Sequence, residues 1–146
     1  MSFDTDLAIG HKSEERVLRI IQRRYPEAHR IQGKHSAFDI LVPELSISVE
    51  VKGDYRSQDT GNIVVEVNHP IGKPSGLLVT TADYWVHDTL KELIWIKPDK
   101  IKDCIMVYNY KPRDWAAGDD RYAKRVYLVP IEVYRTFACM YYDYEP

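Results

Sequence analysis

Two stretches, Phe38-Asp39-Ile40-Leu41-Val42 and Ser48-Val49-Glu50-Val51-Lys52, decide the fold that this chain is expected to adopt. Apolar and β-branched residues dominate both, which predicts two strands joined by a tight turn. Side chains two residues apart on a strand share a face, so Glu50 and Lys52 point one way and the two valines point into the core. Asp39 lies on the strand that the turn folds back beside the second. The pattern predicts that three ionisable groups meet at one patch.

The segments on either side of these strands predict an α/β domain. Apolar residues recur at helical spacing over 13–24, and Pro26 ends that helix. Further strands are expected at 28–31, 63–67, 83–87, 92–97 and 125–129, and further helices at 98–107 and 131–139. Polar, turn-rich loops are expected at 53–62, 69–76 and 109–120. A helix followed by a β-meander and mixed elements predicts one domain over 1–146, with a central mixed sheet flanked by helices.

Composition narrows the class of protein. The chain has 146 residues, 45% of them apolar and 29% charged, which suits one globular domain. No apolar run approaches a membrane span, and the first residues lack an apolar signal core, so a cytoplasmic protein is expected. Cys104 and Cys139 have no metal-ligand spacing, which favours two free thiols.

Charge is uneven along the chain. The net charge is −2, but residues 11–35 hold seven Lys or Arg against three Glu. Such a segment could meet phosphates, or it could be the solvated face of a helix.

The patch of Asp39, Glu50 and Lys52 has the chemistry of a Mg²⁺ site. Two carboxylates can hold this hard cation and leave room for water and a phosphate oxygen. A bound metal polarises a phosphate and lowers the pKa of a bound water, and a lysine beside it stabilises charge in the transition state. The simpler alternative is an exposed Glu-Lys pair on an ordinary strand.

This arrangement resembles the PD-(D/E)XK nuclease superfamily. Asp39, in Phe-Asp instead of Pro-Asp, matches the first acid, and Glu50-Val51-Lys52 matches the Glu-x-Lys element. The resemblance implies a restriction-endonuclease-like fold and Mg²⁺- or Mn²⁺-dependent hydrolysis of phosphodiester bonds in DNA. It implies that Asp39, Glu50 and the backbone carbonyl of Val51 bind the metal. Lys52 would position the attacking water and stabilise charge.

The resemblance extends to the first helix and to the segment after Lys52. The run from Gly10 to Glu15 looks like the start of the family's first helix, and Glu14 is its expected metal-binding acid, with Glu15 in reserve. An ordinary first-turn acid is the alternative for Glu14. Thr60-Gly61-Asn62 resembles a turn of restriction-like members, and Glu66 beyond it is either a further acid or a plain strand residue. Candidate DNA contacts are Lys34, Ser57, Asn62, Lys73 and Ser75.

The sequence therefore predicts a Mg²⁺-dependent deoxyribonuclease, expected to be endonucleolytic. DNA is the expected partner, a homodimer would let two sites cut both strands, and a bacterial or phage-infected cytoplasm is the expected setting. Junction-resolving, restriction-type and repair or phage enzymes remain equal readings. The rival hypothesis is a non-catalytic nucleic-acid-binding or protein-interaction module that keeps the nuclease fold. The presence of both acids and the lysine favours the enzyme.

Overall fold

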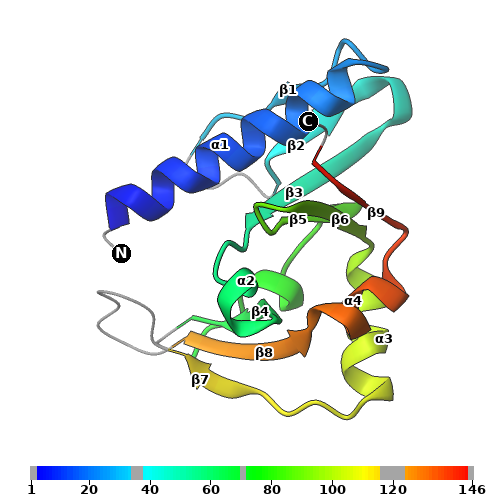
Figure 1. Cartoon of the computed structure of the whole chain (residues 1–146). Helices are drawn as coiled ribbons and strands as arrows, with labels where there is room; N and C mark the ends of the chain where they lie inside the picture. Colours follow the sequence, from blue (N-terminus) through cyan, green and yellow to red (C-terminus); the bar gives the residue numbers. More distant parts are fainter. Residues whose placement is uncertain (1–2, 34–37, 70–71, 116–123, 145–146) are drawn as a thin grey trace.

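The computed structural model describes residues 3–33, 38–69, 72–115 and 124–144. Its first element is the helix α1 (Phe3–Gln22), which lies along one side of the molecule (Figure 1). Val17 and Ile21 bury its inner face. The helix begins ten residues before the expected start at Ser13 and ends ahead of Pro26, as expected.

A mixed six-stranded sheet lies beneath α1. Its strands are β1 (His29–Arg30), β2 (Ile40–Val42), β3 (Ile47–Gly53), β5 (Tyr84–Asp88), β6 (Glu92–Ile96) and β9 (Met140–Asp143). They pair in the order β1-β2-β3-β5-β6-β9. Only the pairing of β3 with β5 is parallel, and the other pairings are antiparallel. The predicted α/β domain with a mixed sheet is confirmed at this level.

The turn between β2 and β3 is tight, as predicted. It is a single 3-10 turn, Pro43–Leu45, closed by Ser46 at a φ of 53°. The amide of Ser46 donates to the carbonyl of Pro43. This turn returns the chain directly, so β3 runs antiparallel beside β2.

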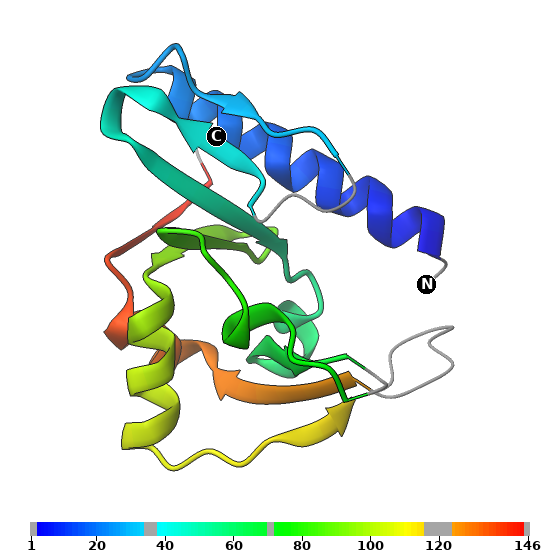
Figure 2. The ribbon, with the colours of Figure 1, turned by 180° about the vertical axis from the view of Figure 1, so that it is seen from behind.

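A second, three-stranded antiparallel sheet was not expected from the sequence. It consists of β4 (Asn62–Asn68), β8 (Lys124–Pro130) and β7 (Arg113–Trp115), paired in the order β4-β8-β7. It lies across from α1, on the other side of the six-stranded sheet (Figure 1). The helices α3 (Pro98–Val107) and α4 (Ile131–Phe137) stand at one end of it, as the view from behind shows (Figure 2).

Three expectations for local structure were wrong. The segment 53–62 contains the short helix α2 (Ser57–Thr60) and is not all loop. The expected loop at 109–120 contains β7, and the expected helix 131–139 ends at Phe137. The strand β9 follows that helix and completes the edge of the six-stranded sheet.

The six-stranded sheet separates two hydrophobic cores. Val49 and Val51 face α1 and join a cluster with Val17 and Ile21. On the other face, Trp85 joins a cluster with strands of the second sheet and with α3 and α4. Within the described residues, no helix is long and apolar enough to cross a membrane.

Gly76 holds the loop after β4 against the second sheet. It begins the 3-10 turn Gly76–Leu78 and has a φ of +50°, in the left-handed region. A Cβ at this position would overlap the backbone carbonyl of Glu66. A glycine is therefore required here.

Candidate active site

Asp39 stands where β2 begins, against the middle of β3. Its amide donates to the carbonyl of Val49 at 3.0 Å, and its own carbonyl accepts from Ile31 at 2.8 Å. Its Oδ2 accepts a hydrogen bond of 2.7 Å from the amide of Val51. The carboxylate thus replaces the strand partner that β2 does not supply to Val51, and this fixes its position.

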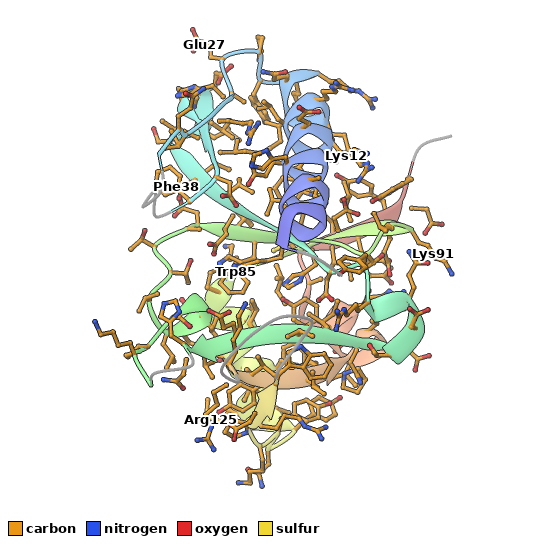
Figure 3. All side chains as sticks on the ribbon, turned by 90° about the vertical axis from the view of Figure 1, so that its left-hand side faces the viewer. Lys12, Glu27, Phe38, Trp85, Lys91 and Arg125 are labelled. Atoms are coloured by element: carbon orange, nitrogen blue, oxygen red, sulfur yellow. The ribbon has the colours of Figure 1, made fainter. Side chains whose placement is uncertain are left out.

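Glu50 and Lys52 occupy the face of β3 that is turned toward the second sheet. The distance from Lys52 Nζ to Glu50 Oε1 is 3.6 Å, and Lys52 Nζ lies 5.1 Å from the centroid of the Trp85 ring. Figure 3 shows Trp85 between α1 and the second sheet. The side chains of Glu50 and Lys52 remain 20% and 38% exposed, so a ligand in solution can reach both.

Thr80 links Glu50 to Trp85. Its hydroxyl donates to Glu50 Oε2 at 3.4 Å and accepts from Trp85 Nε1 at 2.9 Å. This chain of hydrogen bonds orients the Glu50 carboxylate from below. No sequence pattern predicted this link, because Thr80 lies on a loop thirty residues from Glu50.

The backbone of Val51 presents its carbonyl to the Asp39 side of β3. The amide and carbonyl of one strand residue point to the same edge, and the Val51 amide points at Asp39. The Val49 carbonyl, two residues back, also points to this edge, since it accepts from Asp39. The carbonyl that the family resemblance assigns to a metal therefore lies on the same edge as the Asp39 carboxylate.

Glu14 approaches the same place from α1. It forms an ion pair with Arg30 of β1, and its side chain is 19% exposed. Glu15 is 54% exposed and lies 3.9 Å from Arg19 on its own helix. Of the two helix acids, Glu14 is the one on the sheet side.

Asp39 influences both glutamates electrostatically. Burial raises the pKa of Glu14, the Asp39 carboxylate raises it further, and Arg30 acts in the opposite direction. Burial likewise raises the pKa of Glu50, Lys52 opposes the change, and Asp39 adds to it. The negative charge of Asp39 therefore disfavours ionisation of both glutamates.

The donor set fits a hydrated Mg²⁺ better than a fully protein-bound metal. Among the residues that the structure describes, no three His, Cys, Asp or Glu side chains are grouped as a ready metal site. Mg²⁺ commonly binds through one or two carboxylates and keeps several waters. Asp39 and Glu50, with the Val51 carbonyl, could supply such a set.

The other sequence candidates are placed less favourably. Ser57 is buried, and its hydroxyl donates to the carbonyl of Asp54. Ser75 is also buried, and its hydroxyl donates to Glu66 at 2.6 Å. The prediction that these two hydroxyls face DNA does not fit this structure, because both are buried and donate to groups within the protein.

The remaining candidates are Asn62, Lys73, Glu66 and Lys34. Lys73 is exposed and Asn62 is half-buried at the start of β4. Glu66 belongs to the second sheet and lies 3.4 Å from Lys124 Nζ, so it is engaged as a strand residue. Lys34 lies outside the residues that the structure describes.

Comparison of the chain with protein-family models, with curated proteins and with solved structures found no match. The resemblance to the PD-(D/E)XK superfamily therefore rests on the residues of this chain alone.

Proposed function

We propose that this chain is a metal-dependent DNA nuclease with its site at Asp39, Glu50 and Lys52. The observation that carries the proposal is the contact of Asp39 with the Glu50-Val51-Lys52 strand, since Asp39 binds the Val51 amide at 2.7 Å while Lys52 lies 3.6 Å from Glu50. These contacts support the proposal because two carboxylates and one ammonium group come from two adjacent strands, β2 with the residue before it and β3.

The arrangement around these residues is consistent with a restriction-endonuclease-like fold. A helix precedes an antiparallel run of three strands, and a further strand lies parallel to the third. The second sheet, built from β4 between β3 and β5 in the chain and from β7 and β8 after β6, is an elaboration of that plan. We propose the fold family on this order of elements and on the motif together.

Each residue has a separate chemical task in this proposal. Asp39, Glu50 and the Val51 carbonyl hold Mg²⁺ or Mn²⁺, and Glu14 binds the metal or orders water around it. The metal supplies Lewis acidity, which activates water and polarises a phosphate. Lys52 places a positive charge where negative charge builds up on the phosphate oxygens. Hydrolysis forms a P–O bond to the oxygen of the attacking water, which gives up a proton, and breaks the P–O bond to the leaving oxygen, which takes up a proton.

The rival, a non-catalytic module, predicts an inert site. The non-catalytic hypothesis expects two observations, a Lys52 ion pair at the site and no metal binding. In this structure Lys52 contacts Glu50 on its own strand, so metal binding is the observation that decides. Calorimetric titration of the protein with Mn²⁺ distinguishes the nuclease, which should bind the metal, from the non-catalytic module, which should not.

The decisive experiment is incubation of the pure protein with supercoiled, linear, single-stranded and branched DNA, with Mg²⁺ or with EDTA. We expect cleavage of at least one substrate with Mg²⁺ and none with EDTA. Asp39→Asn keeps an oxygen that can accept from the Val51 amide but removes the charge, so it should fold and fail to cut. Asp99→Asn, at an exposed position of α3, is the matched control and should cut normally. Intact activity of Asp39→Asn, or no cleavage by the native protein, would refute the assignment.

A further inference from the structure

A basic groove runs along the flank of α1 that faces β6 and β9. It has a volume of about 360 Å³. The helix contributes four cations and one acid to its lining, Lys12, Arg16, Arg19, Arg23 and Glu15. The opposite wall consists of Leu93 and two tyrosines from the end of the chain, Tyr142 and Tyr144. We call this the α1 groove.

The cations of the α1 groove form one row. Positions 12, 16, 19 and 23 follow the three- and four-residue spacing that places side chains on one side of a helix. Eleven residues separate the first from the last, which corresponds to about 16 Å along the helix axis. A row of this length suits successive charges on an extended polyanion and is longer than a single small anion needs.

Arg16 is held in place at the wall of the groove. Its Nη1 forms an ion pair with Asp88, which is fully buried, and donates to the Tyr144 hydroxyl at 2.8 Å. The guanidinium lies 4.5 Å from the centroid of the Tyr144 ring. These hydrogen bonds use Nη1, and a guanidinium carries five N–H donors in a fixed fork. An anion in the groove would therefore meet an arginine that has already lost its conformational freedom.

Positive charge is concentrated in this groove. Its lining carries four cations and one acid, and with the buried Asp88 that pairs with Arg16 its net charge is +2, while the whole chain carries −2, so the remainder carries −4. Asp88 neutralises Arg16, but the pairing of Arg19 with Glu15 is exposed and 3.9 Å long. Such a surface pair contributes little and exchanges readily. The groove thus attracts an anion in a chain that otherwise repels one.

We propose that the α1 groove binds the sugar-phosphate backbone of duplex DNA, outside the phosphate that is cut. This inference rests on the proposed nuclease function, since it assigns DNA as the occupant. Phosphate contacts from Lys and Arg fix the register of a duplex without reading its sequence. Lys12 and Phe38, which precedes Asp39, lie on opposite sides of α1 (Figure 3). Since α1 also packs against β3, a duplex arm held in the groove would be fixed relative to Asp39.

Binding of a labelled duplex in EDTA tests the groove independently of cleavage. The test variant is Lys12→Gln/Arg19→Gln, because both side chains are exposed and their loss should not disturb folding. The control is Lys100→Gln/Lys111→Gln, which removes two exposed cations near α3, away from α1 (Figure 1). Both double variants change the net charge from −2 to −4, by removal of two positive charges.

We expect the groove variant to bind the duplex roughly tenfold more weakly at low salt. The slope of log affinity against log salt should fall by about two, one for each lost phosphate contact. The control variant should keep the native affinity and slope. Equal behaviour of the two variants, native affinity in the groove variant, or no duplex binding by the native protein would each overturn the proposal. The proposal would also be overturned if the groove variant lost affinity for an RNA duplex of the same sequence and kept its affinity for the DNA duplex.

The result is separable from the proposed function. A native protein that binds the duplex through Lys12 and Arg19 but cuts no DNA with Mg²⁺ would retain the groove and refute the nuclease. If the native protein cuts DNA and the groove variant binds the duplex normally, the nuclease is retained and the groove is refuted.

Discussion

The amide of Val51 donates a 2.7 Å hydrogen bond to Oδ2 of Asp39, so a backbone group of β3 holds a carboxylate from the preceding strand. The amide of Asp39 also donates to the carbonyl of Val49, so both the backbone and the side chain of Asp39 are bound to β3. A ligand held between Asp39 and Glu50 would meet a site whose geometry is largely set in advance.

Replacement of Lys52 by alanine should abolish most cleavage. The ammonium is proposed to stabilise charge that develops in the transition state, so kcat should fall by about 100- to 1,000-fold. Binding of the duplex in EDTA should change little. Lys100→Ala is the control for the loss of a lysine. Cleavage at the native rate by Lys52→Ala would contradict the role given to this residue.

Replacement of Glu50 by glutamine should stabilise the metal-free protein at neutral pH. Burial, with a contribution from Asp39, raises the pKa of Glu50 above its ordinary value of 4.5. The folded state then holds more protons than the unfolded chain between these two pKa values, so stability from this group falls as pH rises through that window. The variant should melt about 2–4 °C higher than the native protein in EDTA at neutral pH.

The same pair of proteins tests the metal. Below the ordinary pKa of glutamate, the difference in melting temperature should disappear, because the native carboxyl is then protonated in both states. Mg²⁺ should raise the melting temperature of the native protein and affect Glu50→Gln less. Glu132→Gln, at an exposed position of α4, should behave like the native protein. A lower melting temperature for Glu50→Gln in EDTA at neutral pH would contradict the prediction.

Replacement of Gly76 by alanine should destabilise the fold by about 1–3 kcal/mol, because the new Cβ overlaps the Glu66 carbonyl at a positive φ. Denaturant unfolding measures the change. Gly10→Ala is the matched control, since a Cβ there meets no heavy atom within 4 Å. It should stabilise α1 by about 0.5–1 kcal/mol. Equal effects of the two substitutions would show that the overlap is relieved at no cost.

Replacement of Tyr134 by phenylalanine should cost about 1–3 kcal/mol, because it leaves a buried partner unpaired. The Tyr134 hydroxyl lies 2.6 Å from Nε2 of His87, and both side chains are fully buried. Within the described part of the chain, Nδ1 of His87 has no hydrogen-bond partner, and Asp54 Oδ2 lies 3.8 Å from it, so the ring makes its hydrogen bond to Tyr134. Tyr127→Phe, a half-buried position on β8, should change the unfolding free energy by less than about 0.5 kcal/mol. A neutral Tyr134→Phe would contradict this reading.

Local patterns predicted the elements that have their own strong signal. The alternation of valines with Glu50 and Lys52 predicted both the β3 strand and its two faces, and Val49 and Val51 are buried as expected. The helix Pro98–Val107 has the predicted bounds. The first half of α1 was missed because Asp4, Asp6 and Gly10 interrupt the apolar pattern there. The strand β9 was missed because its pairing partner, β6, is distant in sequence. The strand β7 was missed because it has only three residues and no alternating apolar pattern.

The candidate site was predicted in part for the same reason. Glu50 and Lys52 share a strand, so their proximity follows from spacing alone. The contact of Asp39 with the Val51 amide depends on where β2 begins, and the choice of Glu14 over Glu15 depends on how α1 is rotated. The roles of Arg30 and Thr80 had no sequence signal, because their partners Glu14 and Glu50 are distant from them in sequence.

The ion pair between Arg16 and Asp88 brings together segments from three parts of the chain. Asp88 ends β5, Arg16 is on α1, and Tyr144 follows β9 and also contacts both of them. A carboxylate with no exposed surface is costly unless such partners are present. The central strand β5 therefore gains little stability by folding alone. Its buried carboxylate is stabilised only when α1 and the segment after β9 dock against it. Cooperative, all-or-none unfolding is the behaviour that this mutual dependence produces.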